Sequence, residues 1–309
     1  MADLSLNPAP APVAAPSRRF GLNLDPTLRG IGLYCIALVL FTGMGVTAKS
    51  LAAIYPIEQV IWGRYFFHVL LIVMLFPTRI LSLFQTKRVG LQISRSVLVF
   101  AATVCGFTSL SVMPMAEVSA IGYVAPLMVT VLSIFVLKEK VGPRRLGAVL
   151  IGFAGVFVIL RPDQANFSYW SLLPLAMAAC YASFMIMTRM IRDAAPPINS
   201  LFYTAIVGAV VATIPLPFIW VTPEPIHWLA FAAMGLIGGT GHFLMIRAFE
   251  TAEASAIAPF IYTELIWAVL AGMLVFGDMP TVEMLAGAAV IMASGGYVLY
   301  RERKVGAKS

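Results

Sequence analysis

Ten apolar runs, each about as long as a bilayer is thick, occupy most of this chain. A membrane-spanning helix takes roughly 20 predominantly apolar residues, and charges, Pro and Gly separate one run from the next. We therefore expect an all-α integral membrane protein. The ten predicted transmembrane helices cover residues 29–50, 57–77, 93–113, 115–137, 144–161, 169–190, 198–220, 225–249, 253–276 and 282–300.

The composition supports a membrane domain and argues against several classes of soluble protein. Apolar residues make up 60% of the 309 residues and charged residues 11%, against about 45–50% and about 25% in soluble domains. The ten spans leave no room for a separate soluble catalytic domain. The net charge is +7, but the basic residues are scattered and form no stripe, so we expect no nucleic-acid partner. The three cysteines lie within apolar runs, which argues against disulfides and metal binding.

The lysines and arginines are concentrated on one side of the predicted membrane domain. Eighteen of the 21 lie in the two tails, in the even-numbered connections or at the helix ends beside them, whereas Lys49 and Arg161 lie at helix ends beside odd-numbered connections and Arg64 lies well inside a predicted helix. The positive-inside rule then predicts that both termini are cytoplasmic. Residues 1–27, rich in Pro and Ala, are expected to be a disordered tail, and residues 301–309 a second, basic one.

The two halves of the chain contain related sequences. Ala-Glu-x-Ser-Ala begins at residue 116 and again at residue 252, an offset of 136, and beyond a short insertion the offset is 140, which pairs Gly147 with Gly287. Five spans per repeat is an odd number, so the second copy should be inverted in the membrane. Inverted repeats are typical of transporters, although gene duplication in a membrane scaffold is the alternative. We assign the repeats to residues 28–161 and 162–300.

Prolines inside two of the spans predict matching helix breaks. Pro126 lies in the fourth span and Pro259 in the ninth, and the offset of 136 pairs Tyr123 with Pro259 and Pro126 with Tyr262. A proline cannot donate its backbone hydrogen bond, so both spans should kink there. Broken helices at matching depth in two halves indicate a binding site near the midplane.

Several motifs resemble those of the EamA-type carriers in the drug/metabolite transporter superfamily, over about residues 28–300. The similarity is carried by AKSL (48–51), WGRYFF (62–67), VLKEKVGPRRLGAVLIGFAGVFVIL (136–160), APFIYTELIW (258–267) and FGDMP (276–280). The second half most resembles a branch with bacterial uptake carriers for S-adenosylmethionine and riboflavin, while other relatives export amino acids. The resemblance implies an inner-membrane carrier with a central cavity and with the fifth and tenth spans at the periphery.

Glu264 is the most informative single residue. It lies near the middle of the ninth predicted span, where a charge costs roughly 2.5–3.5 kcal/mol on insertion scales. We interpret it as a substrate-binding or proton-coupling carboxylate, since intramembrane ionisable groups are functional candidates. A structural hydrogen bond between helices is the alternative.

Other candidates fall into three groups. Arg64 is a candidate for an anionic substrate group or for pairing with Glu58 or Glu264, with an interfacial arginine as the alternative. His242 is a further candidate for substrate binding and His68 for coupling or gating, with a satisfied interhelical hydrogen-bond donor as the favoured alternative for each. The aromatic candidates for stacking a flat substrate are Phe260 and Trp267, which share a helix face with Glu264, together with Trp62, Tyr123 and Tyr262.

Three charged residues at helix ends are candidates for gating or coupling. Lys49 closes the first span, where an interfacial anchor is the favoured interpretation. Glu117 and Glu253 begin the fourth and ninth spans, and helix capping at the rim is favoured for both over gating.

Together these features predict a secondary active or facilitative carrier, not an enzyme. The sequence has no HExxH, GxSxG, CxxC or GxxxxGK motif. The favoured cargo is a heteroaromatic metabolite such as riboflavin or an S-adenosylmethionine-like compound, taken up by alternating access. Export of amino acids or drugs is the alternative, and a membrane-embedded transferase is a weaker one. Expected partners are a small molecule and lipid, with a proton as candidate coupling ion and homodimerisation open. We expect no cofactor and no metal.

Overall fold

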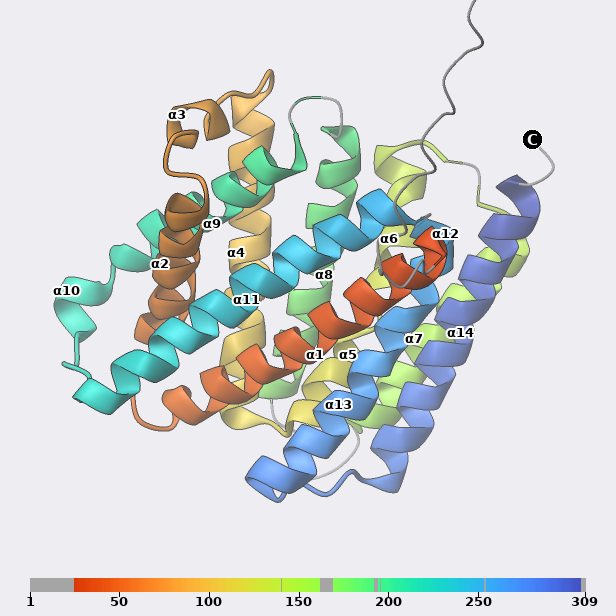
Figure 1. The fold of residues 1–309 in the computed structure, drawn as a ribbon. Helices are drawn as coiled ribbons and strands as arrows, with labels where there is room; N and C mark the ends of the chain where they lie inside the picture. The colour runs from red at the N-terminus through yellow and green to blue at the C-terminus, as the bar shows by residue number, and fades with distance from the viewer. Residues whose placement is uncertain are drawn as a thin grey trace, which may run out of the picture.

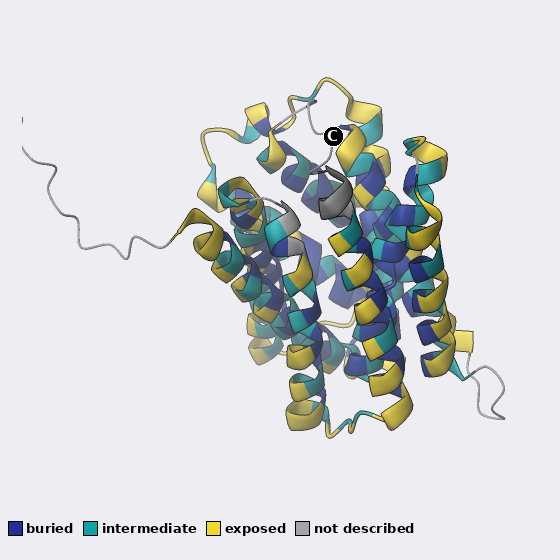
Figure 2. Ribbon diagram, turned by 90° about the vertical axis from the view of Figure 1, so that its right-hand side faces the viewer, coloured by how far each residue is buried: buried dark blue, intermediate teal, exposed yellow. Residues whose placement is uncertain are grey.

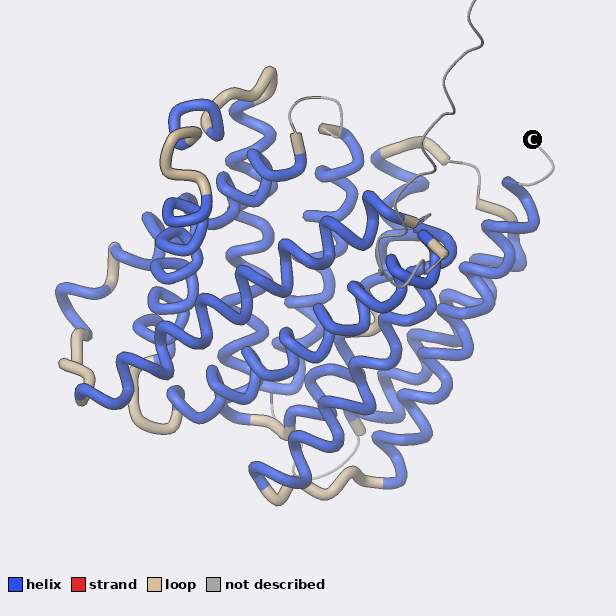
Figure 3. Tube along the Cα trace, viewed as in Figure 1, coloured by secondary structure: helices blue, strands red, loops and turns tan. Residues whose placement is uncertain are grey.

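The computed structural model is helical throughout, and no strand occurs in the part of the chain that it describes, residues 25–139, 141–161, 169–191, 194, 196–252 and 254–306 (Figure 3). The predicted all-α membrane fold is confirmed. The principal helices are α1 (Pro26–Ala52), α2 (Ile57–Leu75), α4 (Val89–Val112), α5 (Met115–Gly122), α6 (Ala125–Val136), α7 (Pro143–Leu160), α8 (Leu173–Met190), α9 (Pro197–Thr213), α11 (Pro225–Thr251), α13 (Thr263–Ala271) and α14 (Val282–Gly306). Short helices are α3 (Ile80–Leu83), α10 (Leu216–Ile219) and α12 (Ala254–Ile257).

Nine of the spans in the described chain are long and apolar enough to cross a membrane, and the seventh predicted span is shorter than expected. It was predicted to run over 198–220, but α9 ends at Thr213 after 17 residues and the short α10 follows. Pro215 and Pro217 explain the difference, because proline removes a backbone donor and disfavours helix in the residue before it.

The outer faces of the helices are apolar. Leu274 is 83% exposed and Phe218 88% exposed, and exposed residues run along the outward faces of the helices while buried ones line the inside (Figure 2). A soluble protein rarely leaves so much apolar surface open. Acyl chains are the environment that these faces fit.

The helices form one bundle in which both described ends of the chain lie at the same end (Figure 1). We name this the inner end and the opposite one the outer end, following the charge-based prediction of the orientation. Helix α1 packs along α11, and α4 packs along α8. In an inverted repeat of five spans these two contacts are counterparts, since α1 corresponds to α8 and α4 to α11.

The fifth and tenth spans, α7 and α14, pack against each other at one edge of the bundle (Figure 1). Glycines allow the close approach: a Cβ on Gly155 would lie 2.8 Å from the carbonyl oxygen of Gly287. The hydroxyl of Ser294 donates to the carbonyl oxygen of Ala148 across the same contact. Small residues at helix contacts are the usual device for tight packing in membranes.

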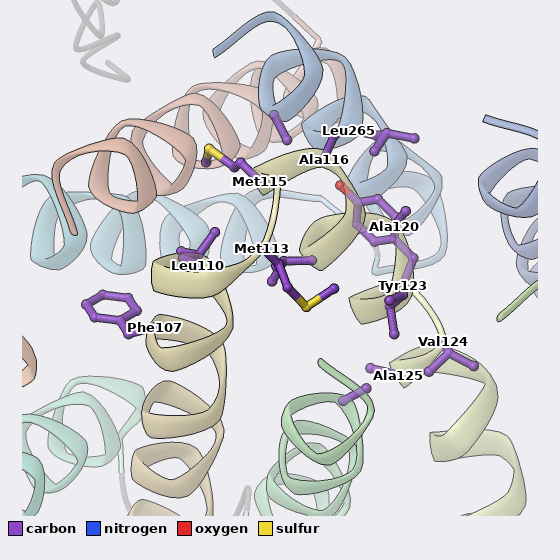
Figure 4. Close-up of a cluster of buried hydrophobic side chains, with 14 of the residues drawn as sticks. Phe107, Leu110, Met113, Met115, Ala116, Ala120, Tyr123, Val124, Ala125 and Leu265 are labelled. Carbon is purple, nitrogen blue, oxygen red and sulfur yellow. The ribbon is translucent and has the colours of Figure 1, made fainter. Parts of the chain in front are cut away.

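The fourth and ninth spans are both interrupted near the centre of the bundle. In the fourth span α5 ends at Gly122 and α6 begins at Ala125, with Pro126 in its first turn. In the ninth span a 3₁₀ segment over Ala258–Tyr262, with Pro259 in its first turn, leads into α13. Figure 4 shows Tyr123 at the first break, with Leu265 of α13 near α5.

Candidate functional site

Glu264 lies in the first turn of α13, directly after the break in the ninth span. Its side chain is partly exposed although it belongs to the middle of a span. Its carboxylate makes no hydrogen bond or ion pair with the residues that the structure describes. An intramembrane carboxylate without a protein partner needs water, a proton or a ligand, so Glu264 is available for one of these.

Three tyrosines from three other spans lie within electrostatic range of this carboxylate. Glu264 lies near enough to Tyr34 of α1, Tyr123 at the α5–α6 break and Tyr181 of α8 to act electrostatically on their hydroxyl groups. Sequence reasoning found Tyr123 but missed Tyr34 and Tyr181. Tyr34 and Tyr181 each lie in an apolar run without a nearby charge or helix break that would indicate a functional role.

Arg64 and Glu264 both lie within electrostatic range of Tyr181. The guanidinium is buried, donates to Thr103 Oγ1 at 2.6 Å and lies over the rings of Tyr65 and Phe107. It forms no ion pair with Glu58 or Glu264, both of which the structure describes. The interfacial interpretation of Arg64 is wrong, because its head group is turned into the bundle and held by Thr103.

Tyr123 and Tyr262 connect the two helix breaks. Their ring centroids are 5.6 Å apart, and neither buried hydroxyl has a hydrogen-bond partner within the described chain. They lie the same number of residues before Lys138 and Gly277, the two residues with positive φ that follow these spans. Counting back from these residues pairs Tyr123 with Tyr262 by an offset of 139, whereas the Ala-Glu-x-Ser-Ala motif pairs Tyr123 with Pro259 by an offset of 136.

The two predicted histidines lie side by side on α2 and α11. The Nδ1–H of His242 donates to the carbonyl oxygen of Gly238 at 2.9 Å, and the ring centroid of His242 is 5.9 Å from that of His68. His68 is buried, and its Nε2 has no hydrogen-bond partner in the described chain. Arg64 acts electrostatically on both rings.

The other aromatic candidates lie in different parts of the bundle, and of these Phe260 lies near Tyr34. Trp62 stacks on Phe66 and meets Trp220 edge-on, in an aromatic group at the outer end. Trp267 is 40% exposed, and Phe260 packs with a small apolar cluster that includes Tyr34 and Leu38. Because residues 258–262 are 3₁₀ and not α-helical, the spacing of four that placed Phe260 on the face of Glu264 does not hold there.

Lys49 is not the interfacial anchor that the sequence favoured. Its ammonium donates to Asp278 Oδ2 at 2.9 Å and to the carbonyl oxygen of Met113 at 3.0 Å. Glu117 lies near Arg161 and Asp278 at the same end, and no hydrogen bond from its side chain caps α5. Glu253 lies outside the described residues, as do residues 1–24 and 307–309 of the predicted tails.

Comparison with known families decides the class of protein. The model of the EamA-like transporter family matches this chain twice, over residues 28–161 and 168–300. The chain belongs to this family. As an EamA-like transporter it is a multi-pass membrane protein that moves a small molecule, and transport, not catalysis, is its class of activity.

Individual relatives of this EamA-like transporter carry different cargoes. The S-adenosylmethionine uptake transporter of Rickettsia bellii is 27% identical and covers 90% of this chain and 96% of its own. The riboflavin transporter of Vibrio cholerae is 32% identical over 58% of this chain and 61% of its own. The pseudopaline exporter CntI of Pseudomonas aeruginosa is 23% identical over 88% of this chain and 96% of its own.

A solved crystal structure shares the fold. It matches 91% of this EamA-like transporter and 98% of its own chain with a TM-score of 0.61 at 18% identity. At that identity the match supports the arrangement of the helices alone.

Proposed function

We propose that this chain is a secondary active or facilitative carrier that takes up a zwitterionic heteroaromatic metabolite, such as S-adenosylmethionine, across a bacterial inner membrane. One observation carries the proposal: the carboxylate of Glu264 is partly exposed in mid-span and has no partner among the described residues. A charge kept at this depth without a protein partner suits a group that binds cargo or a coupling proton.

The charges around Tyr181 favour a cargo with both signs of charge. Glu264 and Arg64 act on this tyrosine together, so an ammonium or sulfonium group near Glu264 and a carboxylate near Arg64 would each meet an opposite charge. The rings of Tyr34, Tyr123 and Tyr181 offer faces for a flat heterocycle and for a cation. S-adenosylmethionine has all three groups. Riboflavin has the flat ring but no charges for Arg64 and Glu264, so we rank it second.

Uptake by proteoliposomes tests this proposal. Labelled S-adenosylmethionine, riboflavin and an aromatic amino acid are offered with and without a pH gradient. We expect S-adenosylmethionine to enter, and we expect Glu264→Gln to reduce its uptake at least tenfold with unchanged protein abundance. Glu58→Gln is the matched control, since Glu58 is exposed in the first turn of α2.

Other outcomes of this assay would revise the proposal. Undiminished uptake by Glu264→Gln would remove the carboxylate from the mechanism. Preference for an amino acid, with flux outward in preloaded vesicles, would favour the exporter alternative. Stimulation by an inward proton gradient that Glu264→Gln abolishes would identify the proton as the coupling ion.

We further propose that the two five-span repeats, residues 28–161 and 162–300, are inverted and that both termini are cytoplasmic. The exchange of helix contacts between α1–α11 and α4–α8 supports the inversion, and the distribution of Lys and Arg supports the orientation. Fusion of alkaline phosphatase, which is active only outside the cytoplasm, tests both. A fusion after Arg303 should be inactive and one in the 214–224 connection active, and the reverse pattern would overturn the orientation. A fusion in the 76–88 connection, the equivalent place in the first repeat, should be inactive, and activity there would overturn the inversion.

A further inference from the structure

Lys49 ties together three elements at the outer end of the bundle. Besides Asp278, which follows the ninth span, and the carbonyl oxygen of Met113, in the turn between α4 and α5, its ammonium lies 4.8 Å from the ring centroid of Phe276. Lys49 belongs to α1, which packs with α11 and α13, whereas Met113 follows α4, which packs with α8. The hydrogen bond from Lys49 to Met113 therefore joins these two groups of helices.

A second ion pair has the same place in the other half. Arg189, in the last turn of α8, donates to Glu139 Oε1 at 2.8 Å, directly after the fourth span. Arg189 lies 140 positions after Lys49, and Asp278 lies 139 positions after Glu139. The first offset equals the one that relates Gly147 to Gly287, and the second differs from it by one residue.

The backbone presents both acids in the same way. Lys138 has φ 54° and Gly277 has φ 70°, and these are the residues just before Glu139 and Asp278. The N–H of Glu139 donates to the carbonyl oxygen of Ser133 at 3.1 Å, and that of Asp278 to Gly272 at 2.9 Å. Both spans thus end on a left-handed residue followed by an N–H bond that reaches six residues back, one residue further than in a Schellman motif. Each of these helix ends places an acid beside a cation on the first helix of one half.

The two ion pairs differ in their third contact. The structural counterpart of Met113, the residue that ends α4, is Ala252, the residue that ends α11; both have an extended backbone. Arg189 bonds Glu139 but not Ala252, both of which the structure describes. The side chains of Arg189 and Glu139 are 54% and 40% exposed, against 17% and 26% for Lys49 and Asp278. Helix α1 also packs against α4, whereas α8 and α11 barely touch within the described chain.

We propose that Lys49 and Arg189 are the two gates of the transport cycle, each aimed by its own acid. In the state seen here, Lys49 closes the outer end by binding the Met113 carbonyl, while Arg189 leaves the inner end open. When the halves exchange conformations, Lys49 releases Met113 and Arg189 binds the turn at Ala252. This inference rests on the proposed carrier function, because it assigns the residues that open the site around Glu264 to one side of the membrane or the other.

The test measures access to the site and needs no substrate. In a chain with Cys35, Cys105 and Cys180 replaced by Ser, a single cysteine is introduced as Tyr181→Cys, and a membrane-impermeant maleimide is added to intact cells or to inverted vesicles. Lys49→Gln should raise the labelling rate from the outside about tenfold, the scale of losing one charge-assisted hydrogen bond. Arg189→Gln should change it in the opposite direction, lowering labelling from the outside and raising it from the inside.

Matched variants separate gating from misfolding. Lys49→Arg keeps the charge and the bond to Asp278 and should leave the labelling pattern unchanged, and all variants are compared at equal membrane abundance. Effects of the same sign for Lys49→Gln and Arg189→Gln, or no effect of either, would overturn the assignment. Opposite effects on labelling combined with no uptake of any tested compound would uphold the gates and refute the proposed cargo.

Discussion

The ring of Tyr123 meets that of Tyr262 edge-on, with the centroids 5.6 Å apart and the planes at 76°. One ring comes from the break in the fourth span and the other from the break in the ninth, so the two interrupted helices touch through equivalent residues. Neither hydroxyl has a hydrogen-bond partner in the described chain. Buried polar groups are rarely left unpaired in this way, which makes both hydroxyls candidate contacts for cargo or ordered water.

The first prediction concerns these hydroxyls. Tyr123→Phe and Tyr262→Phe keep the ring contact and remove an unpaired buried polar group, whose desolvation costs about 1–3 kcal/mol. The thermal midpoint in detergent should therefore stay unchanged or rise, while KM for uptake should rise about fivefold if the hydroxyls bind the substrate (about 1 kcal/mol by). A lower midpoint for both variants would mean that the hydroxyls have partners in the folded protein.

The second prediction concerns the charge of Arg64. If its guanidinium binds the carboxylate of the cargo, Arg64→Gln should raise KM for S-adenosylmethionine at least tenfold, about 1.4 kcal/mol. Decarboxylated S-adenosylmethionine lacks that carboxylate, so its KM should change little. Equal losses for both compounds would show that Arg64 acts through its bond to Thr103 and the rings of Tyr65 and Phe107, as a structural residue.

A third prediction tests the contact between α7 and α14. A side chain on Gly155 would run into the backbone of Gly287 and the side chain of Val290, and overpacking a tight contact costs about 1–3 kcal/mol. Gly155→Leu should lower the thermal midpoint by several degrees (an order-of-magnitude expectation from). Gly147→Ala, at a position with open space around its Cβ, is the control and should not change it. Equal midpoints for the two variants would contradict the close approach.

Sequence patterns located the spans and Glu264 because both depend on local properties: the length of an apolar run and a charge within it. They failed where a contact joins distant parts of the chain. No local sequence feature near Lys49 predicts its ion pair with Asp278, 229 residues later. The apolar sequences around Tyr34 and Tyr181 would be the same whether these rings faced lipid or the centre of the bundle. The early end of α9 was foreseeable from Pro215 and Pro217.

The two possible pairings of Tyr123, with Pro259 and with Tyr262, have a similar cause. Matching by Ala-Glu-x-Ser-Ala fixes the offset before the insertion, but the sequence does not say where the additional residues go. In the structure the 3₁₀ segment Ala258–Tyr262 lies between the repeated motif and α13, where the fourth span has only the turn at Tyr123 and Val124. Local backbone geometry, and not residue identity, decides the pairing.

The last prediction separates structure from coupling at His68. Its Nε2 lacks a partner in the described chain, and its side chain borders a cavity of about 260 Å³ lined by apolar residues such as Leu71, Ile72 and Phe243. A proton relay needs a hydrogen-bonded route to and from the ring, and none reaches this nitrogen from the described residues. His68→Leu should thus keep both uptake and its response to a pH gradient. His242→Leu is the comparison, because it loses the bond to Gly238 and should be less stable by about 1 kcal/mol. If His68→Leu instead abolished the response to the gradient at normal abundance, His68 would be a coupling residue.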